Sequence, residues 1–134
     1  CGAIIVILNA LPKLVDLELQ FRLLPHDVVA PHLLAIEVMH LEDLGFCEKG
    51  EGGPFISSGR IGPGGTCPVN TNGGGMSYCH PGMYGIFTII EATRQLRSQG
   101  EDRQVDGAQI ALAHGVGGVW SAAATSILGT EATL

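Results

Sequence analysis

The chain of 134 residues is long enough for one domain, which would bury roughly two thirds of the surface of the unfolded chain. An apolar fraction of 46% with only 15% charged residues is typical of a folded chain and excludes a disordered one. The formal net charge of −6 and the scattered lysines and arginines argue against a nucleic-acid binder. No apolar run in the sequence reaches the length of a membrane span.

Four cysteines are spread along the chain, at Cys1, Cys47, Cys67 and Cys79. None belongs to a Cys-x-x-Cys pair and no histidines have the spacing of a zinc finger, so the sequence predicts no metal site. Reduced thiols in a cytoplasmic protein are the main interpretation, and a disulfide pair is the alternative. The first residue is not methionine and a strand-like run follows at once, so we expect a fragment of a longer chain.

The first part of the chain contains one predicted strand and one predicted helix. Residues 3–9 form a continuous apolar run, which indicates a buried strand. A helix is predicted over residues 25–46, where five apolar residues keep roughly one helical face: Val28, Leu33, Ile36, Met39 and Leu44. Gly45 is a natural end for this helix, because glycine readily adopts the left-handed conformation that closes a helix.

Between Cys47 and Gly75 the chain is rich in glycine, with three consecutive glycines at positions 73–75. Residues with free φ mark loops that bend sharply or come close to a ligand. A solvated linker is the alternative, but it would not need the apolar side chains that interrupt this segment, which are Phe55, Ile56, Ile61 and Val69. We therefore expect an irregular loop region that is anchored to the core.

The last part of the chain predicts a helix followed by a β-hairpin. Pro81 suits the first turn of the helix and Gly100 ends it. Five apolar residues between them recur near helical spacing: Met83, Ile86, Phe87, Ile90 and Leu96. Residues 109–113 indicate a strand, residues 114–118 a glycine-rich turn and residues 119–128 a second strand. Strands that alternate with helices predict a layered α/β fold.

One segment, residues 70–82, combines features that suit a binding site. Its glycines let the backbone approach a ligand, and His80 stands directly before the predicted helix. The positive end of a helix dipole disfavours a protonated imidazole, so His80 should stay neutral. A neutral imidazole N–H can stabilise an enolate or an oxyanion. A purely structural histidine is the alternative.

The sequence of this segment, NTNGGGMSYCHPG, resembles the C-terminal signature of the thiolase superfamily. In that signature an asparagine-rich strand with two glycines leads into Gly-His-Pro and a helix. Here Cys79-His80-Pro81 stands in place of Gly-His-Pro, and the resemblance makes His80 the oxyanion-hole histidine. It also implies that three residues contact the substrate, namely Asn72, Gly74 and Gly75.

A second stretch, HGVGG at residues 114–118, resembles the glycine-rich active-site loop near the thiolase C-terminus. The resemblance implies that His114 belongs to the catalytic site and that Gly117 and Gly118 contact the substrate. In thiolases a cysteine that acts as acid and base precedes those glycines, whereas His114 stands there in this chain and no cysteine is near. That departure argues against Claisen-type thiolysis.

The sequence GGGMSYCHPGMYG, followed by EATRQLR, is most similar to sequences of the lipid-transfer, sterol-carrier branch of the superfamily. Some members of that branch are retro-aldolases that break down steroid side chains and are active only beside an OB-fold partner protein. By this resemblance Tyr78 and Tyr84 are candidate acid/base groups. A phenolate stabilised near a helix N-terminus could accept a proton. The alternative is that both tyrosines only pack.

The resemblance extends from Leu41 to Leu128, so we predict two parts: a poorly matching N-terminal segment at 1–40 and a thiolase-like C-terminal domain at 41–134. The family's aromatic and acidic motif, which contributes to the site, would lie just upstream of this domain. Pro31–Ala35 stands there instead, with His32 as the candidate remnant. We therefore expect residues 1–40 not to pack as in a thiolase.

The resemblance implies an α/β fold, namely a thiolase-like C-terminal half with a mixed β-sheet covered by helices. One exposed face should meet the missing N-terminal half. It further implies acyl-CoA as substrate, no other cofactor, and a homo-oligomer in the full-length form. Three functions stay open. The chain is part of an acyl-CoA enzyme (an acetyl-CoA acetyltransferase-like acyltransferase or a retro-aldolase in lipid or steroid degradation), a non-catalytic lipid or acyl-CoA carrier, or a degenerate fragment.

Overall fold

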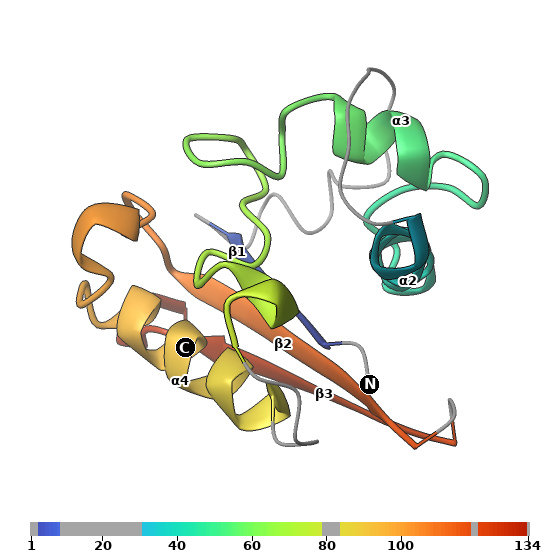
Figure 1. Ribbon diagram of the computed structural model, residues 1–134. Helices are drawn as coiled ribbons and strands as arrows, with labels where there is room; N and C mark the ends of the chain where they lie inside the picture. Colours follow the sequence, from blue (N-terminus) through green and yellow to red (C-terminus); the bar gives the residue numbers. More distant parts are fainter. Residues whose placement is uncertain (1–2, 9–30, 79–83, 119–120, 134) are drawn as a thin grey trace.

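The computed structural model describes residues 3–8, 31–78, 84–118 and 121–133 (Figure 1). The main elements follow in the order β1 (Ala3–Leu8), α2 (Pro31–Asp43), α3 (Gly52–Ser57), α4 (Tyr84–Leu96), β2 (Ile110–Gly117) and β3 (Ala122–Gly129). Three short 3-10 helices accompany them: η1 (Gly74–Met76), η2 (Glu101–Arg103) and η3 (Glu131–Thr133). The predicted helical residues 25–30 and 81–83 lie outside the described residues.

The strands form one sheet in the order β1-β2-β3, and both neighbouring pairs are antiparallel. β1 confirms the strand predicted from the apolar run, and β2 with β3 confirms the hairpin. The predicted turn at 114–118 is wrong, however, because His114 to Gly117 continue β2 and pair with Thr125 to Ala122. Cross-strand hydrogen bonds to β3 hold these glycines extended despite their weak strand propensity. The turn lies between residues 117 and 122.

Helices cover both faces of the sheet, which confirms the α/β class (Figure 1). Because side chains alternate along a strand, Val6 of β1 faces a core shared with α2 and α3, whereas Ile5 and Ile7 face α4. The part of the sheet that the structure describes is antiparallel throughout. The boundary predicted at residue 40 stays a prediction; Pro31–Ala35 forms the first turns of α2.

The C-terminal end of α2 is closed by a Schellman motif. The N–H of Gly45 donates to the carbonyl of Glu42 at 3.2 Å, and the N–H of Phe46 donates to the carbonyl of Leu41 at 2.9 Å. Gly45 has φ +81°, so its predicted role as helix terminator is confirmed. The motif also brings Phe46 into the same buried cluster as Leu41 and Phe55. Capping and core packing therefore favour the same local structure.

The predicted apolar face of α4 is wrong in part, because α4 turns other residues toward the sheet. Its buried side chains are Tyr84, Thr88, Glu91, Ala92 and Gln95. The small side chains among them let the helix lie close to β1 and β2. Three isoleucines instead point outward and are 38% to 52% exposed; we call Ile86, Ile89 and Ile90 the isoleucine face. On α2, Met39 is likewise 47% exposed.

The end of α4 also differs from the prediction. The helix finishes at Leu96 rather than at Gly100, since Ser98 adopts the left-handed conformation with φ +55°. The N–H of Gln99 donates to the carbonyl of Arg94 at 2.8 Å, which closes the last turn. A residue other than glycine therefore performs the capping function here, at a small conformational cost.

Cys47 and Cys67 are buried and free. Burial raises the pKa of the Cys47 thiol to about 11 and the pKa of the Cys67 thiol to about 12. Such thiols stay protonated near neutral pH, so neither is suited to nucleophilic chemistry. Cys1 and Cys79 lie outside the described residues. No helix within the described ranges is long and apolar enough to cross a membrane.

Candidate functional site

The segment Asn70–Asn72, which we call the NTN segment, runs beside β1. Just before it, Val69 forms an isolated bridge with Val6. The N–H of Asn70 donates to the carbonyl of Ile5 at 2.9 Å, and its side-chain oxygen accepts the N–H of Ile5 at 3.2 Å. Asn70 has φ +51°, a conformation that asparagine tolerates better than most residues. The sheet therefore fixes the start of the segment.

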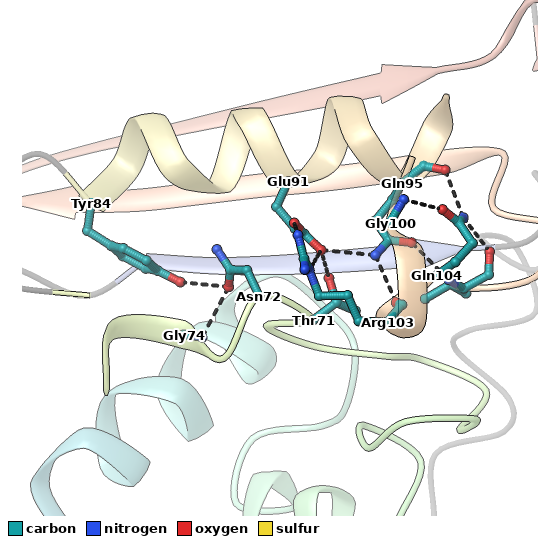
Figure 2. A network of polar contacts seen from close by, with 10 residues as sticks. Thr71, Asn72, Gly74, Tyr84, Glu91, Gln95, Gly100, Arg103 and Gln104 are labelled. Atoms are coloured by element: carbon teal, nitrogen blue, oxygen red, sulfur yellow. Dashed lines mark hydrogen bonds and ion pairs between the residues drawn. The ribbon is translucent and has the colours of Figure 1, made fainter. Parts of the chain in front are cut away.

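Tyr84 approaches the NTN segment from the first turn of α4 (Figure 2). Its hydroxyl donates to Oδ1 of Asn72 at 3.2 Å, and the same oxygen accepts the N–H of Gly74 at 3.1 Å. Burial raises the pKa of Tyr84 to about 12. The expected stabilised phenolate is therefore wrong for Tyr84. A phenol with this pKa is protonated near neutral pH and can donate a proton.

The glycines of this segment support the turn in front of Tyr84. Gly73 and Gly74 both lie in the left-handed region, at φ +90° and φ +67°. A Cβ on Gly73 would also lie 2.0 Å from Oγ of Ser77. Only glycine meets both demands at position 73. Gly75, the third predicted contact residue, is exposed in η1.

Tyr78 belongs to an aromatic cluster with Tyr84 and Phe87. Its ring stacks on the ring of Phe87 with centroids 4.7 Å apart, and it lies 5.6 Å from the ring of Tyr84. Both tyrosines pack, as the alternative interpretation expected. The hydroxyl of Tyr84 has a specific hydrogen-bond acceptor in addition, which distinguishes it from a ring that only fills space.

His114 lies on the other face of the sheet from Tyr84. Its Nδ1 is 2.7 Å from Oγ1 of Thr125, and its ring meets the ring of buried His40 edge to face with centroids 4.8 Å apart. His114 thus points toward α2, whereas Tyr84 belongs to α4. Within the described ranges His114 and Tyr84 therefore do not lie together, although the resemblance assigned both of them to the catalytic site.

Two parts of the predicted site remain untested. His80 lies outside the described residues, so its place beside Tyr84 stays a prediction. Gly117 ends β2, and Gly118 follows it at φ +64°. Both glycines are therefore at the tip of the hairpin, and their predicted contact with a substrate stays a prediction.

The contact between His40 and His114 predicts a loss of stability in acid. Burial lowers the pKa of both imidazoles, and for His40 the neighbouring His114 adds to this, against the opposing effect of Asp43. The native state thus binds protons less readily than the unfolded state, where the pKa is near 6.5. The neutral pair therefore contributes its full stabilisation of the fold above that pH, and this contribution falls as the pH drops through it.

We therefore expect the urea midpoint of the chain to fall between about pH 7 and about pH 5.5. The variant His114→Gln, which keeps an acceptor for Thr125 but cannot become charged, should show a smaller fall. An equal fall of the urea midpoint in the parent chain and in His114→Gln would contradict the role of the His40–His114 pair in the acid-dependent loss of stability.

Sequence reasoning missed a buried polar network on α4 (Figure 2). The carboxylate of Glu91, 2% exposed, accepts hydrogen bonds from Thr71 at 2.8 Å, Gln95 at 2.9 Å and Arg103 at 3.2 Å. Burial alone would raise the pKa of Glu91, but these hydrogen bonds outweigh it and hold the pKa below its usual range. The available signal was a Glu and a Gln four residues apart on one helical face.

A cavity of about 570 Å³ lies between the loop at 61–73 and residues 102–106. Its polar lining includes Asn70, Thr71 and Arg103, and its volume is in the range of small-molecule sites. Neither Asn72 nor Tyr84 lines it, so it is separate from the tyrosine site. Among the described residues, no group of three His, Cys, Asp or Glu side chains is placed to hold a metal ion.

Comparison with known proteins identifies the family. Residues 29–130 match the thiolase C-terminal domain-like family, and the chain belongs to that family. The match confirms the resemblance predicted from the segments at 70–82 and 114–118. It begins upstream of Leu41, so it also includes α2 from its first residue.

Individual relatives belong to several functional types. The chain is 43% identical over 91 residues to an acetyl-CoA acetyltransferase of Methanothermobacter thermautotrophicus, covering 67% of this chain and 24% of that protein. It is 37% identical over 94 residues to sterol carrier protein 2 of Bos taurus, covering 68% and 17%. It is 36% identical over 108 residues to a steroid side-chain-cleaving aldolase of Thermomonospora curvata, covering 76% and 27%.

The chain therefore spans about a quarter or less of the length of these relatives. No solved structure matches it. The family is common to a transferase, a carrier protein and an aldolase, so family membership alone does not select one activity.

Proposed function

We propose that this chain supplies the C-terminal part of an enzyme that cleaves a carbon–carbon bond in an acyl-CoA by a retro-aldol reaction. The buried, protonated phenol of Tyr84, hydrogen-bonded to Asn72 beside a glycine turn, is the main support. The relative named as a steroid side-chain-cleaving aldolase supports the same class of reaction. The high pKa values of Cys47 and Cys67 make these two thiols unsuited to chemistry that needs a thiolate.

In a retro-aldol cleavage, a base removes the proton of the β-hydroxyl group and the carbonyl product forms. The electrons of the broken carbon–carbon bond pass to the α-carbon, giving a thioester enolate that must be protonated. The phenol of Tyr84 would donate that proton, and His80 would donate a hydrogen bond to the enolate oxygen. The base would be a group other than Tyr84.

The isoleucine face supports a role within a larger protein. Three neighbouring isoleucines on α4 leave apolar surface in contact with water, although the helix packs well on its other side. Exposed apolar patches of this kind mark interaction sites. We propose that the N-terminal half of a complete thiolase-like protein covers this face. An OB-fold partner and a homo-oligomer of the full-length protein are further proposals that follow from the family.

The isolated chain should show no thiolysis of acetoacetyl-CoA. The described cysteines are buried with raised pKa values, and His114 occupies the place of the family's acid/base cysteine. The assay follows the loss of acetoacetyl-CoA on addition of CoA, with an acetyl-CoA acetyltransferase as positive control. Measurable thiolysis by the pure chain would contradict the proposal.

A chimera tests the proposed activity itself. Residues 29–130 would replace the matching segment of the Thermomonospora curvata aldolase, and the release of ketone and shortened acyl-CoA would be measured. Cleavage supports the proposed function. Binding of acyl-CoA without cleavage supports a lipid or acyl-CoA carrier instead, the second candidate, which the match to sterol carrier protein 2 favours. A chimera that neither binds nor cleaves supports a degenerate fragment.

A further inference from the structure

Two neighbouring side chains of the NTN segment form hydrogen bonds with α4 at different positions along the helix (Figure 2). The hydroxyl of Thr71 donates a hydrogen bond to Glu91 in the middle of α4 at 2.8 Å. Asn72 instead accepts a hydrogen bond from the hydroxyl of Tyr84 in the first turn of α4. Thr71 therefore attaches the segment to the polar network. Asn72 connects it to the reactive phenol, and the two contacts can be changed separately.

The hydrogen bonds fix the orientation of the Asn72 amide. A backbone N–H can only donate, so the atom of Asn72 that faces the N–H of Gly74 at 3.1 Å must be the oxygen. The same oxygen lies 3.2 Å from the hydroxyl of Tyr84. The hydroxyl must therefore donate to it. The resting direction of the Tyr84 O–H bond is set by Asn72.

The surroundings of Tyr84 fix its ring but leave the rotation of its O–H bond free to vary. Tyr84 is 8% exposed and its ring lies against the rings of Tyr78 and Phe87, so packing fixes the ring plane. Packing does not fix the rotation of the O–H bond about the ring. Conjugation keeps the O–H bond near the ring plane, and a hydrogen-bond acceptor selects one of the two in-plane directions.

The other end of the amide points to a role beyond folding. Nδ2 of Asn72 is buried and has no hydrogen-bond partner in the part of the chain that the structure describes. Native structures contain few such donors, because an unpaired buried donor is unfavourable. A buried amide side chain that served folding alone would be expected to form hydrogen bonds through both its oxygen and its nitrogen.

We infer that Asn72 is a positioning residue of the proposed site: its side-chain oxygen holds the O–H bond of Tyr84 in one direction and in register with the turn at Gly74. The inference rests on the proposed function for its catalytic meaning. It assigns Asn72 a contact to Tyr84, whereas the substrate contact expected for Asn72 stays a prediction.

The contact can be tested without any activity assay. The sequence contains two tyrosines, so Tyr78→Phe leaves Tyr84 as the sole tyrosine. In that full chain, labelled with ¹³Cζ-tyrosine, NMR gives one resonance for the Tyr84 phenol. Asn72→Ala should move this resonance toward that of a free tyrosine amide in water. Thr71→Val, which changes the neighbouring contact to α4, should leave it in place.

A second variant keeps the test decisive if Asn72→Ala fails to fold. Asn72→Asp retains an acceptor oxygen and adds negative charge, so it should move the resonance in the opposite direction. Unmoved resonances in the folded variants of Asn72 would overturn the inference, whatever the activity of the chimera.

The positioning role is tested by a double-mutant cycle in the aldolase chimera. Asn72→Ala should lower kcat by about 10-fold to 10²-fold and leave KM nearly unchanged. In the Tyr84→Phe background, the same change should alter kcat by less than about twofold. Equal losses in both backgrounds, or a rise in KM alone, would overturn positioning. An inactive parent chimera would count against the proposed function, and the NMR shift would still decide the contact.

Discussion

Replacing Tyr84 with phenylalanine should lower the turnover of the aldolase chimera by about 10²-fold or more, the usual contribution of a general acid. The substitution removes only the hydroxyl that donates to Asn72 and keeps the ring against Tyr78 and Phe87. Loss of one neutral hydrogen bond should cost about 1 kcal/mol, so the fold should persist. The measurement is the steady-state rate of ketone release.

Thr93→Val is the matched control for Tyr84→Phe. It also removes one hydroxyl from α4, where Thr93 donates to the carbonyl of Ile89 within the helix. This hydroxyl lies away from Asn72 and should not affect the rate. A Tyr84→Phe chimera that turns over as fast as its parent would remove Tyr84 from the mechanism.

Glu91→Leu should be strongly destabilising, by about 3 kcal/mol in the free energy of unfolding. Thr71 and Gln95 would lose their buried acceptor, and Arg103 would lose its carboxylate partner. The side chain of Arg103 is 39% exposed, so water compensates its charge in part and limits the loss. Urea denaturation measures the change, and Asp102→Asn in the neighbouring η2 should stay within about 0.5 kcal/mol of the parent.

The pH dependence separates the charge of Glu91 from its shape. Its native pKa lies below the ordinary value of 4.5, so its ionisation stabilises the fold above that pH. This contribution is lost as the pH falls through the native pKa. Glu91→Gln keeps the shape but not the charge and should flatten the pH dependence of stability in this acidic range. An unchanged dependence would mean that Glu91 does not hold the network.

The sequence predicted the local features whose causes are local. The end of α2 depends on Gly45 and on the apolar residues around it, and all of these are visible in one short stretch. The segment at 70–82 was recognised by its resemblance to the C-terminal signature of the thiolase superfamily, which the family match confirms. These features need no knowledge of what packs against them.

The predictions that failed depended on distant partners. An apolar face normally points inward, yet the isoleucine face of α4 is exposed, as expected if another part of a larger protein covers it. The glycines after His114 indicated a turn, but pairing with β3 extends the strand through Gly117. For Tyr84, the predicted helix N-terminus favoured the phenolate, whereas burial raises the pKa to about 12. Neither burial nor pairing can be read from local sequence.

The most direct test of retro-aldol chemistry follows the proton that Tyr84 would deliver. The chimera would be run in D₂O without added CoA, and the released acyl-CoA would be analysed by mass spectrometry. The proposed reaction predicts cleavage with deuterium on the α-carbon of the released acyl-CoA, and Tyr84→Phe should slow its formation by about 10²-fold. Cleavage that requires free CoA, or a product without deuterium at that carbon, would contradict the proposed function.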